Sequence, residues 1–203
     1  MPTLPDGRGP VQARDVGSHA AANLRYIREA IENAGAFTAV SGWGQVVIGA
    51  TALAAAAVAS SQPDQSRWLF TWLLEAALAV TIAAVAILGK ARRRGLSLVS
   101  GASRRFWPSF TAPLAVGAAL TAALVSRSHY GLLPGVWLLL FGAAVVAGGA
   151  VSVPLVRAMG WSFLGLGLVA LLAPPTWADA LLGAGFGGLL ALFGVAIARR
   201  HGG

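Results

Sequence analysis

The sequence predicts an all-α membrane protein, a polytopic bundle of six transmembrane helices. Hydrophobic residues make up 57% of the 203 positions and charged residues only 11%, and the mean hydropathy is +0.72. That apolar share is well above the composition of soluble domains. The apolar residues also fall into six segments, each close to the ~20 residues that a helix needs to cross ~30 Å of hydrocarbon. Finally, the basic residues flank these segments, as topogenic charges do.

The six predicted spans are 42–60, 68–88, 108–125, 132–150, 155–173 and 178–198. The connections after the first, third and fifth spans are short. Because short connections join elements that are neighbours in space, we expect these pairs of helices to pack as antiparallel hairpins. The connection after the second span is longer and basic.

Two further parts precede the first span. The polar, Pro- and Gly-rich residues 1–17 predict a disordered tail, and they contain no apolar segment of the kind that a cleaved signal peptide has. Residues 18–35 predict an amphipathic helix, because Leu24, Ile27 and Ile31 recur at helical spacing. That helix lies either flat on the cytoplasmic leaflet or docked against the bundle or a partner. Residues 36–203 form the predicted transmembrane domain.

The distribution of Lys and Arg predicts the orientation. With the N-terminus in the cytoplasm, all of the fifteen basic residues except Arg67 and Arg127 lie near the cytoplasmic ends of the spans or in the tail. Cytoplasmic loops are enriched in Lys and Arg, so both termini are expected in the cytoplasm. A composition rich in Ala, Gly and Arg is typical of a GC-rich bacterium, and we expect a multi-pass protein of the bacterial cytoplasmic (inner) membrane.

Glu75 is the one ionisable residue well inside a predicted span. An unpaired charge there costs ~2.5 kcal/mol or more, so an intramembrane carboxylate is a functional candidate by default. The alternative is a structural role, in which Glu75 is protonated, reaches the outer interface, or pairs with Arg127 or His129. The helical wheel predicts that Glu75 faces protein and not acyl chains. A single carboxylate supplies no relay across the bilayer, which argues against a proton pump.

Glycines recur at intervals of seven residues in four spans. A heptad keeps them near one helix face, and small-residue faces let membrane helices approach closely. We therefore predict helix packing, the alternatives being a substrate lining or an interface with a second copy. The segments 42–49, 135–142 and 187–194 share an apolar run between such glycines, which reflects either a repeated hairpin or chance. The predicted packing positions are Gly42, Gly49, Gly135, Gly142, Gly149, Gly160, Gly167, Gly183, Gly187 and Gly194.

A basic group between the second and third spans is expected to contact anionic lipid headgroups, at ~1 kcal/mol per residue near the surface. The alternative is topogenic charge alone. No folded nucleic-acid-binding motif surrounds the group, so no nucleic-acid partner is expected. Its members are Lys90, Arg92, Arg93, Arg94, Arg104 and Arg105.

Enzymatic, metal and cofactor sites are not expected. The chain has no cysteine, and its histidines His19, His129 and His201 fall in the tail, an outer loop and the C-terminus. Neither a metal site nor a serine–histidine pair can be assembled within the bilayer from these positions. A phosphate-binding glycine loop followed by Lys-Ser or Lys-Thr is also missing.

Four segments carry a resemblance to a known family. Residues 134–149 and 185–203, together with 23–32 and 37–44, are similar to a family of uncharacterised bacterial six-span integral membrane proteins. The resemblance covers most of the chain and implies the six-span fold without a particular activity. Where that family has a histidine in its last span this chain has Leu190, so no role of that side chain carries over. A looser likeness, of architecture alone, is to hairpin-built six-span acid-resistance membrane proteins.

Two main functions remain open at this point, and a third, a membrane sensor, would need a ligand pocket that the sequence does not show. The first is a non-enzymatic structural, scaffold or regulatory subunit that acts through helix association, with itself or with a membrane-protein partner. The alternative is a small transporter or channel that uses Glu75. A polar cavity beside Glu75 favours transport, whereas a dry helix contact favours a structural role.

Overall fold

The computed structural model describes residue 24 and residues 41–94, 102–150, 152 and 154–201. The chain divides into two units, 1–35 and 36–203, and the second unit contains the helices discussed below. The predicted tail lies outside the described residues, and so does the predicted amphipathic helix apart from Leu24.

The predicted fold class is confirmed, because the described residues contain six helices long and apolar enough to cross a membrane. The sixth is composite, with a π-helical segment, Gly183–Leu189, between two α-helical parts. The helices are α2 (Gly42–Ala59), α3 (Gln65–Arg94), α4 (Ala102–Ser126), α5 (Leu133–Gly149), α6 (Pro154–Leu172), and α7 (Ala178–Leu182) with α8 (Leu190–His201).

Local chemistry explains where several helices begin. The Ser41 side chain caps α2, its Oγ accepting a hydrogen bond from the backbone N–H of Gly44 at 3.2 Å. α4 begins at Ala102, earlier than its predicted start, so Pro108 and Pro113 both lie inside the helix. Membrane helices tolerate such prolines when neighbouring groups satisfy the freed backbone. α3 likewise extends past its apolar part into the charged residues that follow Lys90.

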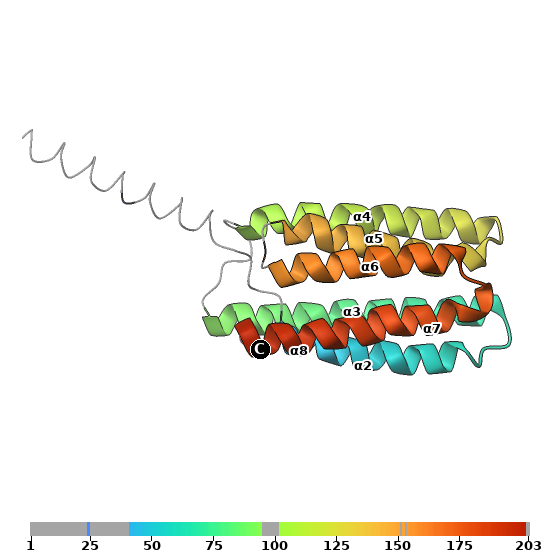
Figure 1. Ribbon diagram of the computed structural model, residues 1–203, viewed down its shortest axis with the longest axis horizontal. Coiled ribbons are helices and arrows are strands. Elements are labelled where there is room, and N and C mark those ends of the chain that lie inside the picture. The colour runs from blue at the N-terminus through green and yellow to red at the C-terminus, as the bar shows by residue number, and fades with distance from the viewer. Residues whose placement is uncertain (1–23, 25–40, 95–101, 151, 153, 202–203) are drawn as a thin grey trace, which may run out of the picture. The chain divides into compact units, whose positions relative to one another are not determined.

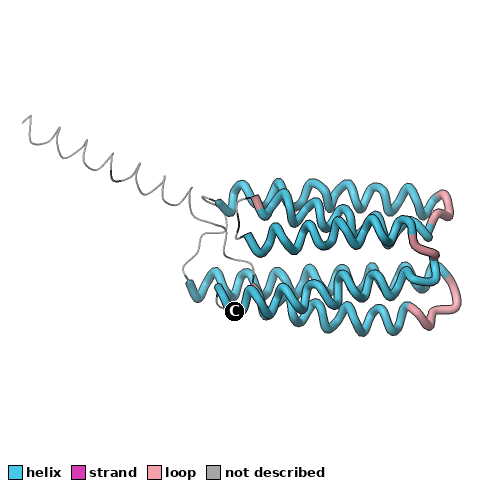
Figure 2. The backbone as a smooth tube through the Cα atoms, viewed as in Figure 1, coloured by secondary structure: helices cyan, strands magenta, loops and turns pink. Residues whose placement is uncertain are grey.

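The six helices form two layers of three, which Figure 1 shows one above the other. α2 packs between α3 and α8 in one layer, and α5 packs between α4 and α6 in the other. Three loops join helices at one end, drawn in pink in Figure 2. The chain enters α2 at the opposite end and α5 at the loop end, so the central helices of the two layers run in opposite directions.

Most basic residues of the described part lie at the end where α3 and α8 finish and α4 and α6 start, which we call the basic end. Arg67 and Arg127 lie at the other end, beside the loops. The described basic residues at the basic end are Lys90, Arg92, Arg93, Arg94, Arg104, Arg105, Arg157, Arg199 and Arg200.

Glycines bring helices into backbone contact within each layer. A Cβ atom added at Gly49 of α2 would lie 2.7 Å from the carbonyl oxygen of Gly187 in the π-helical segment. One added at Gly142 of α5 would lie 2.9 Å from the carbonyl oxygen of Gly160 in α6. Both distances are too short for a side chain, so a residue with a Cβ would separate the helices. The other predicted packing positions also lie against neighbouring helices: Gly42, Gly135, Gly149, Gly167, Gly183 and Gly194.

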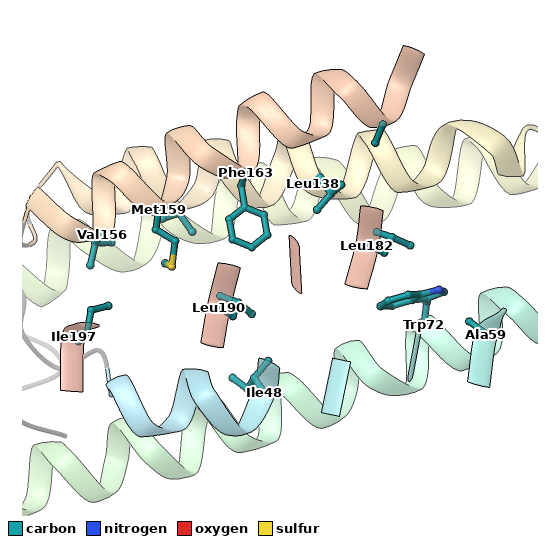
Figure 3. Close-up of a cluster of buried hydrophobic side chains, with 12 residues drawn as sticks. Ile48, Ala59, Trp72, Leu138, Val156, Met159, Phe163, Leu182, Leu190 and Ile197 are labelled. Atoms are coloured by element: carbon teal, nitrogen blue, oxygen red, sulfur yellow. The ribbon is translucent and has the colours of Figure 1, made fainter. Parts of the chain in front are cut away.

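A hydrophobic core joins the two layers on the side where α6 faces the last helix. Figure 3 shows Phe163 and Met159 of α6 facing Leu190 of α8 across the space between the layers. All three side chains are buried, and so are Leu138 of α5 and Leu182 of α7. By contrast, α3 and α4, the outer helices on the other side, do not pack extensively against each other.

Candidate functional site

Glu75 lies in the first half of α3, about 10 Å along the helix from Trp68 at a rise of ~1.5 Å per residue. Its side chain is only 8% exposed, whereas Leu74 beside it is 59% exposed. Glu75 therefore faces protein. The hydroxyl of Thr51 in α2 donates a hydrogen bond to Glu75 Oε1 at 2.8 Å, so the adjacent helix supplies the carboxyl group with a neutral partner.

The Thr51 hydroxyl has two acceptors within reach. Its Oγ1 lies 2.9 Å from the carbonyl oxygen of Ile48 and 2.8 Å from Glu75 Oε1. A hydroxyl carries one hydrogen and two lone pairs. When Glu75 is charged, Thr51 can donate to it. When Glu75 is protonated, the carboxyl O–H can donate to Thr51 while Thr51 donates to Ile48. The geometry thus accommodates both protonation states.

The structure corrects the predicted ionic partners of Glu75. Arg127 and His129 follow the end of α4 at Ser126, where both are exposed. Nδ1 of His129 lies 2.6 Å from the carbonyl oxygen of Arg127. In the part of the chain that the structure describes, neither residue pairs with Glu75, and the ion pair observed joins Arg67 to Asp64 at 3.3 Å. The sequence places Arg127 and His129 in an outer loop, at the end of the bundle where α3 begins, but it does not reveal that α4 belongs to the other layer.

Glu75 lines a cavity of about 600 Å³ between the two layers. α2 contributes Gln45 and Ile48 to the lining, and α3 contributes Trp72 and Ala79 along with Glu75. The opposite wall comes from α4 and α5, with α6, the π-helical segment and α8 closing the far side. The lining is predominantly apolar, and the carboxyl group of Glu75 is its one ionisable group among the described residues.

Aromatic rings form much of the wall opposite α3. Phe110 of α4 meets Phe141 of α5 edge to face with centroids 6.3 Å apart, and Phe141 meets Phe186 of the π-helical segment at 5.3 Å. Phe106 stacks on Phe110 at 5.4 Å. These four rings all line the cavity. Because aromatic pairs prefer edge-to-face or offset-stacked geometry, these contacts favour the observed arrangement of the wall.

A polar cluster links the layers near the end opposite the basic end. The indole N–H groups of Trp68 and Trp72 both donate to Asp179 Oδ1 of α7, at 2.7 and 3.1 Å. Trp68 also stacks on Trp137 of α5, with centroids 5.7 Å apart and planes 4° from parallel. Trp137 in turn donates its N–H to Thr121 Oγ1 of α4 at 2.8 Å. We call Asp179, Trp68, Trp72 and Trp137 the tryptophan cluster.

Sequence reasoning missed Asp179. It lies in the first turn of the last helix, where a carboxylate near the interface is ordinary. The indication available in the sequence was the four-residue spacing of Trp68 and Trp72, which places two indoles on one helix face. That spacing does not say whether the two indoles share an acceptor, and only the fold identifies Asp179 as the one they share.

The predicted headgroup residues lie at the basic end. Arg92, Arg93, Arg104 and Arg105 are exposed there. Lys90, in contrast, is only 6% exposed, so its ammonium group is not freely presented at the surface.

No group of three or more His, Asp or Glu residues that could hold a metal ion occurs among the described residues. No protein-family model, curated protein or solved structure matches this chain. The site geometry therefore carries the functional interpretation.

Proposed function

We propose that this chain is a small, non-enzymatic membrane transporter whose substrate site is the cavity between the two helix layers. The observation that carries the proposal is the position of Glu75. Its carboxyl group is buried and lines a cavity, instead of sitting in a dry helix contact or at the headgroups. An intramembrane carboxylate beside such a space is typical of substrate and proton sites in transporters.

Helix association as the main role has less support. That interpretation rested on the glycines at seven-residue intervals, which could form a surface for a partner. The glycines of α2 and α5 instead lie against the last helix and α6 of the same chain, where Gly49 meets Gly187 and Gly142 meets Gly160. These glycines stabilise the bundle itself, so they offer no free surface to a second protein.

The two layers provide a means of alternating access. Their central helices run in opposite directions, as in transporters with inverted repeats, where one half rocks against the other around a site at the membrane midplane. The layers are joined by the core on the α6 and α8 side. On the other side, the stack of Trp68 on Trp137 links α3 to α5, so opening there requires this stack to break. Glu75, with Thr51, then exchanges a proton or substrate as the cavity changes its opening.

We further propose the bacterial cytoplasmic membrane as the location, with both termini and the basic end in the cytoplasm. The support is the asymmetry of Lys and Arg between the two ends of the bundle, and the exposed arginines at the basic end would face anionic headgroups. A periplasm-active phosphatase fused to the C-terminus should be inactive. Strong activity of that fusion would reverse the orientation.

Cysteine labelling tests the transport proposal directly, because the chain has no cysteine of its own. Ala79 lines the cavity, so Ala79→Cys in oriented proteoliposomes should react with a membrane-impermeant maleimide added to either side. Ala77 is exposed on α3 and does not line the cavity. Ala77→Cys is therefore the matched control and should stay unlabelled in the acyl chains.

Two results would contradict the proposal. If Ala79→Cys is unlabelled from both sides, the cavity is dry and Glu75 is structural. If it is labelled from one side only, the protein is a membrane pocket without alternating access, such as a sensor.

A further inference from the structure

We infer that the cavity binds a lipophilic organic cation, held with its charge at Glu75 and its apolar body against the aromatic wall. The inference rests on the cavity of the proposed function and names the chemical class of its substrate. Three properties of the described site lead to it: the charge of the lining, its hydrogen-bonding groups and its aromatic surface.

Glu75 is the one residue of the described lining that can carry a charge. Among the described residues around the cavity there is no Lys, Arg or His, and Glu75 is the one acidic residue. Its partner Thr51 is neutral. An ionised carboxylate in such surroundings lacks a counter-charge, and a bound cation would supply it. A proton supplies the same charge when the ligand is absent, which the two-acceptor geometry of Thr51 permits.

The hydrogen-bonding groups of the lining disfavour an anion or a sugar. Thr111 donates its hydroxyl hydrogen to the carbonyl oxygen of Trp107 at 2.8 Å, and Thr121 donates to that of Gly117 at 2.7 Å. The Trp72 indole N–H is already bonded to Asp179. These three donors are occupied within the protein, whereas Gln45 and Ser41, which also line the cavity, are neutral. The lining thus offers few free donors to a polyhydroxy ligand and no positive charge to balance an anion.

The apolar and aromatic surface suits the body of such a cation. The volume of about 600 Å³ lies within the range of small-molecule sites, ~300–1,000 Å³. The rings of Phe110, Phe141 and Phe186 present faces and edges to the space, and aromatic faces attract cations. Leu73 and Val80 line the cavity yet are 47% and 69% exposed, so the cavity reaches the lipid-facing surface of α3. A lipophilic ligand can therefore enter from the bilayer.

Tetraphenylphosphonium and tetraphenylborate form a matched pair of probes, since they share shape and apolar surface and differ in the sign of the charge. Binding of each is measured to the full chain in nanodiscs of zwitterionic lipid, by equilibrium dialysis of the radiolabelled ion against empty nanodiscs. We expect saturable binding of the phosphonium and none of the borate. Glu75→Gln should weaken phosphonium binding at least about tenfold, because truncating one side of a buried charge pair is costly.

Two variants make the test specific to Glu75. Asp64→Asn removes a carboxylate that is half exposed at the loop end of the bundle, so it makes the same change in net charge and should leave phosphonium affinity within about twofold. Glu75→Asp keeps the charge and should restore part of the binding that Glu75→Gln loses. Monodisperse elution of each variant in detergent shows that it has folded.

The outcomes separate the two proposals. Three results would overturn the inference that the ligand is a cation. They are the absence of phosphonium binding, equal binding of both ions, and phosphonium binding that survives Glu75→Gln. Such a result leaves the transport proposal standing if Ala79→Cys is still labelled from both sides. Conversely, binding that depends on Glu75 without two-sided labelling supports the cation site and rejects transport.

Discussion

At the scale of single residues, the polar atoms buried between the helices determine what the site can do. Thr51 offers one oxygen of Glu75 a hydrogen-bond partner in either protonation state. Gln45, on the same helix and also lining the cavity, is different: its Oε1 is buried and has no hydrogen-bond donor among the described atoms. Such an unsatisfied group destabilises the empty protein. Because Gln45 also lines the cavity, a bound ligand could supply the missing hydrogen-bond donor.

Gln45→Met should therefore raise stability in the absence of ligand. Methionine keeps the length of the side chain and removes the unpaired amide, whose burial costs ~1–3 kcal/mol. Thermal unfolding in detergent measures the change as an increase in Tm. Gln62→Met is the control, because Gln62 donates to the carbonyl oxygen of Val58 at 3.1 Å and gains nothing from the substitution. An unchanged or lower Tm for Gln45→Met would mean that the amide is satisfied in solution.

The sequence identified Glu75 and not its surroundings. An acidic residue inside an apolar segment is visible without a structure, since its cost in lipid is independent of the fold. Its partner Thr51 lies 24 residues away on another helix, and Asp179 lies 111 residues from Trp68. Those contacts depend on which helices become neighbours. Hydropathy reports that a segment spans the membrane but carries no information on which segment it will touch.

At the scale of the elements, the last helix differs most from a regular span. Its π-helical segment carries glycines on two faces: Gly187 lies against α2, and Gly185 lies against Leu138 and Phe163 of the other layer. One segment thus packs closely on both layers. π-helical turns are frequent at functional sites, and Phe186 of this segment lines the cavity. The heptad spacing of glycines predicted close contacts, whereas the pairing of α2 with the last helix followed only from the fold.

Close packing of α5 on α6 gives a prediction with an internal control. A Cβ atom at Gly142 would lie 2.9 Å from the backbone of both Gly160 and Leu164. Gly142→Ala should therefore lower the free energy of unfolding by ~1–3 kcal/mol, as overpacking does. Gly165 has no atom within 4 Å of an added Cβ, so Gly165→Ala should be neutral or stabilising by up to ~1 kcal/mol through helix propensity. Equal Tm values for the two variants would place Gly142 outside the helix contact.

At the scale of the whole molecule, two groups of contacts of different size hold the layers together. One is the hydrophobic core on the α6 and α8 side. The other is the tryptophan cluster, in which Trp68 of one layer stacks on Trp137 of the other. Tryptophan side chains favour the membrane interface, and Trp177 at 57% exposure fits that role. Trp68, Trp72 and Trp137 instead bond to protein. If the layers separate during transport, this stack is the contact that must break at the end opposite the basic end.

Weakening that stack should therefore change access to the cavity from one side. Trp68→Leu removes the ring that meets Trp137 and one of the two indole bonds to Asp179, while keeping an apolar side chain in place. An aromatic pair contributes ~0.5–1.5 kcal/mol beyond its burial, so the population open at that end should rise about two- to tenfold. In the Ala79→Cys background, maleimide added to that side should react faster by this factor, with the rate from the basic end unchanged or lower. Trp177→Leu, at the same end but exposed, should leave both rates as they were. Equal acceleration from both sides would indicate general loosening of the bundle, and no acceleration would show that the tryptophan cluster does not close the cavity.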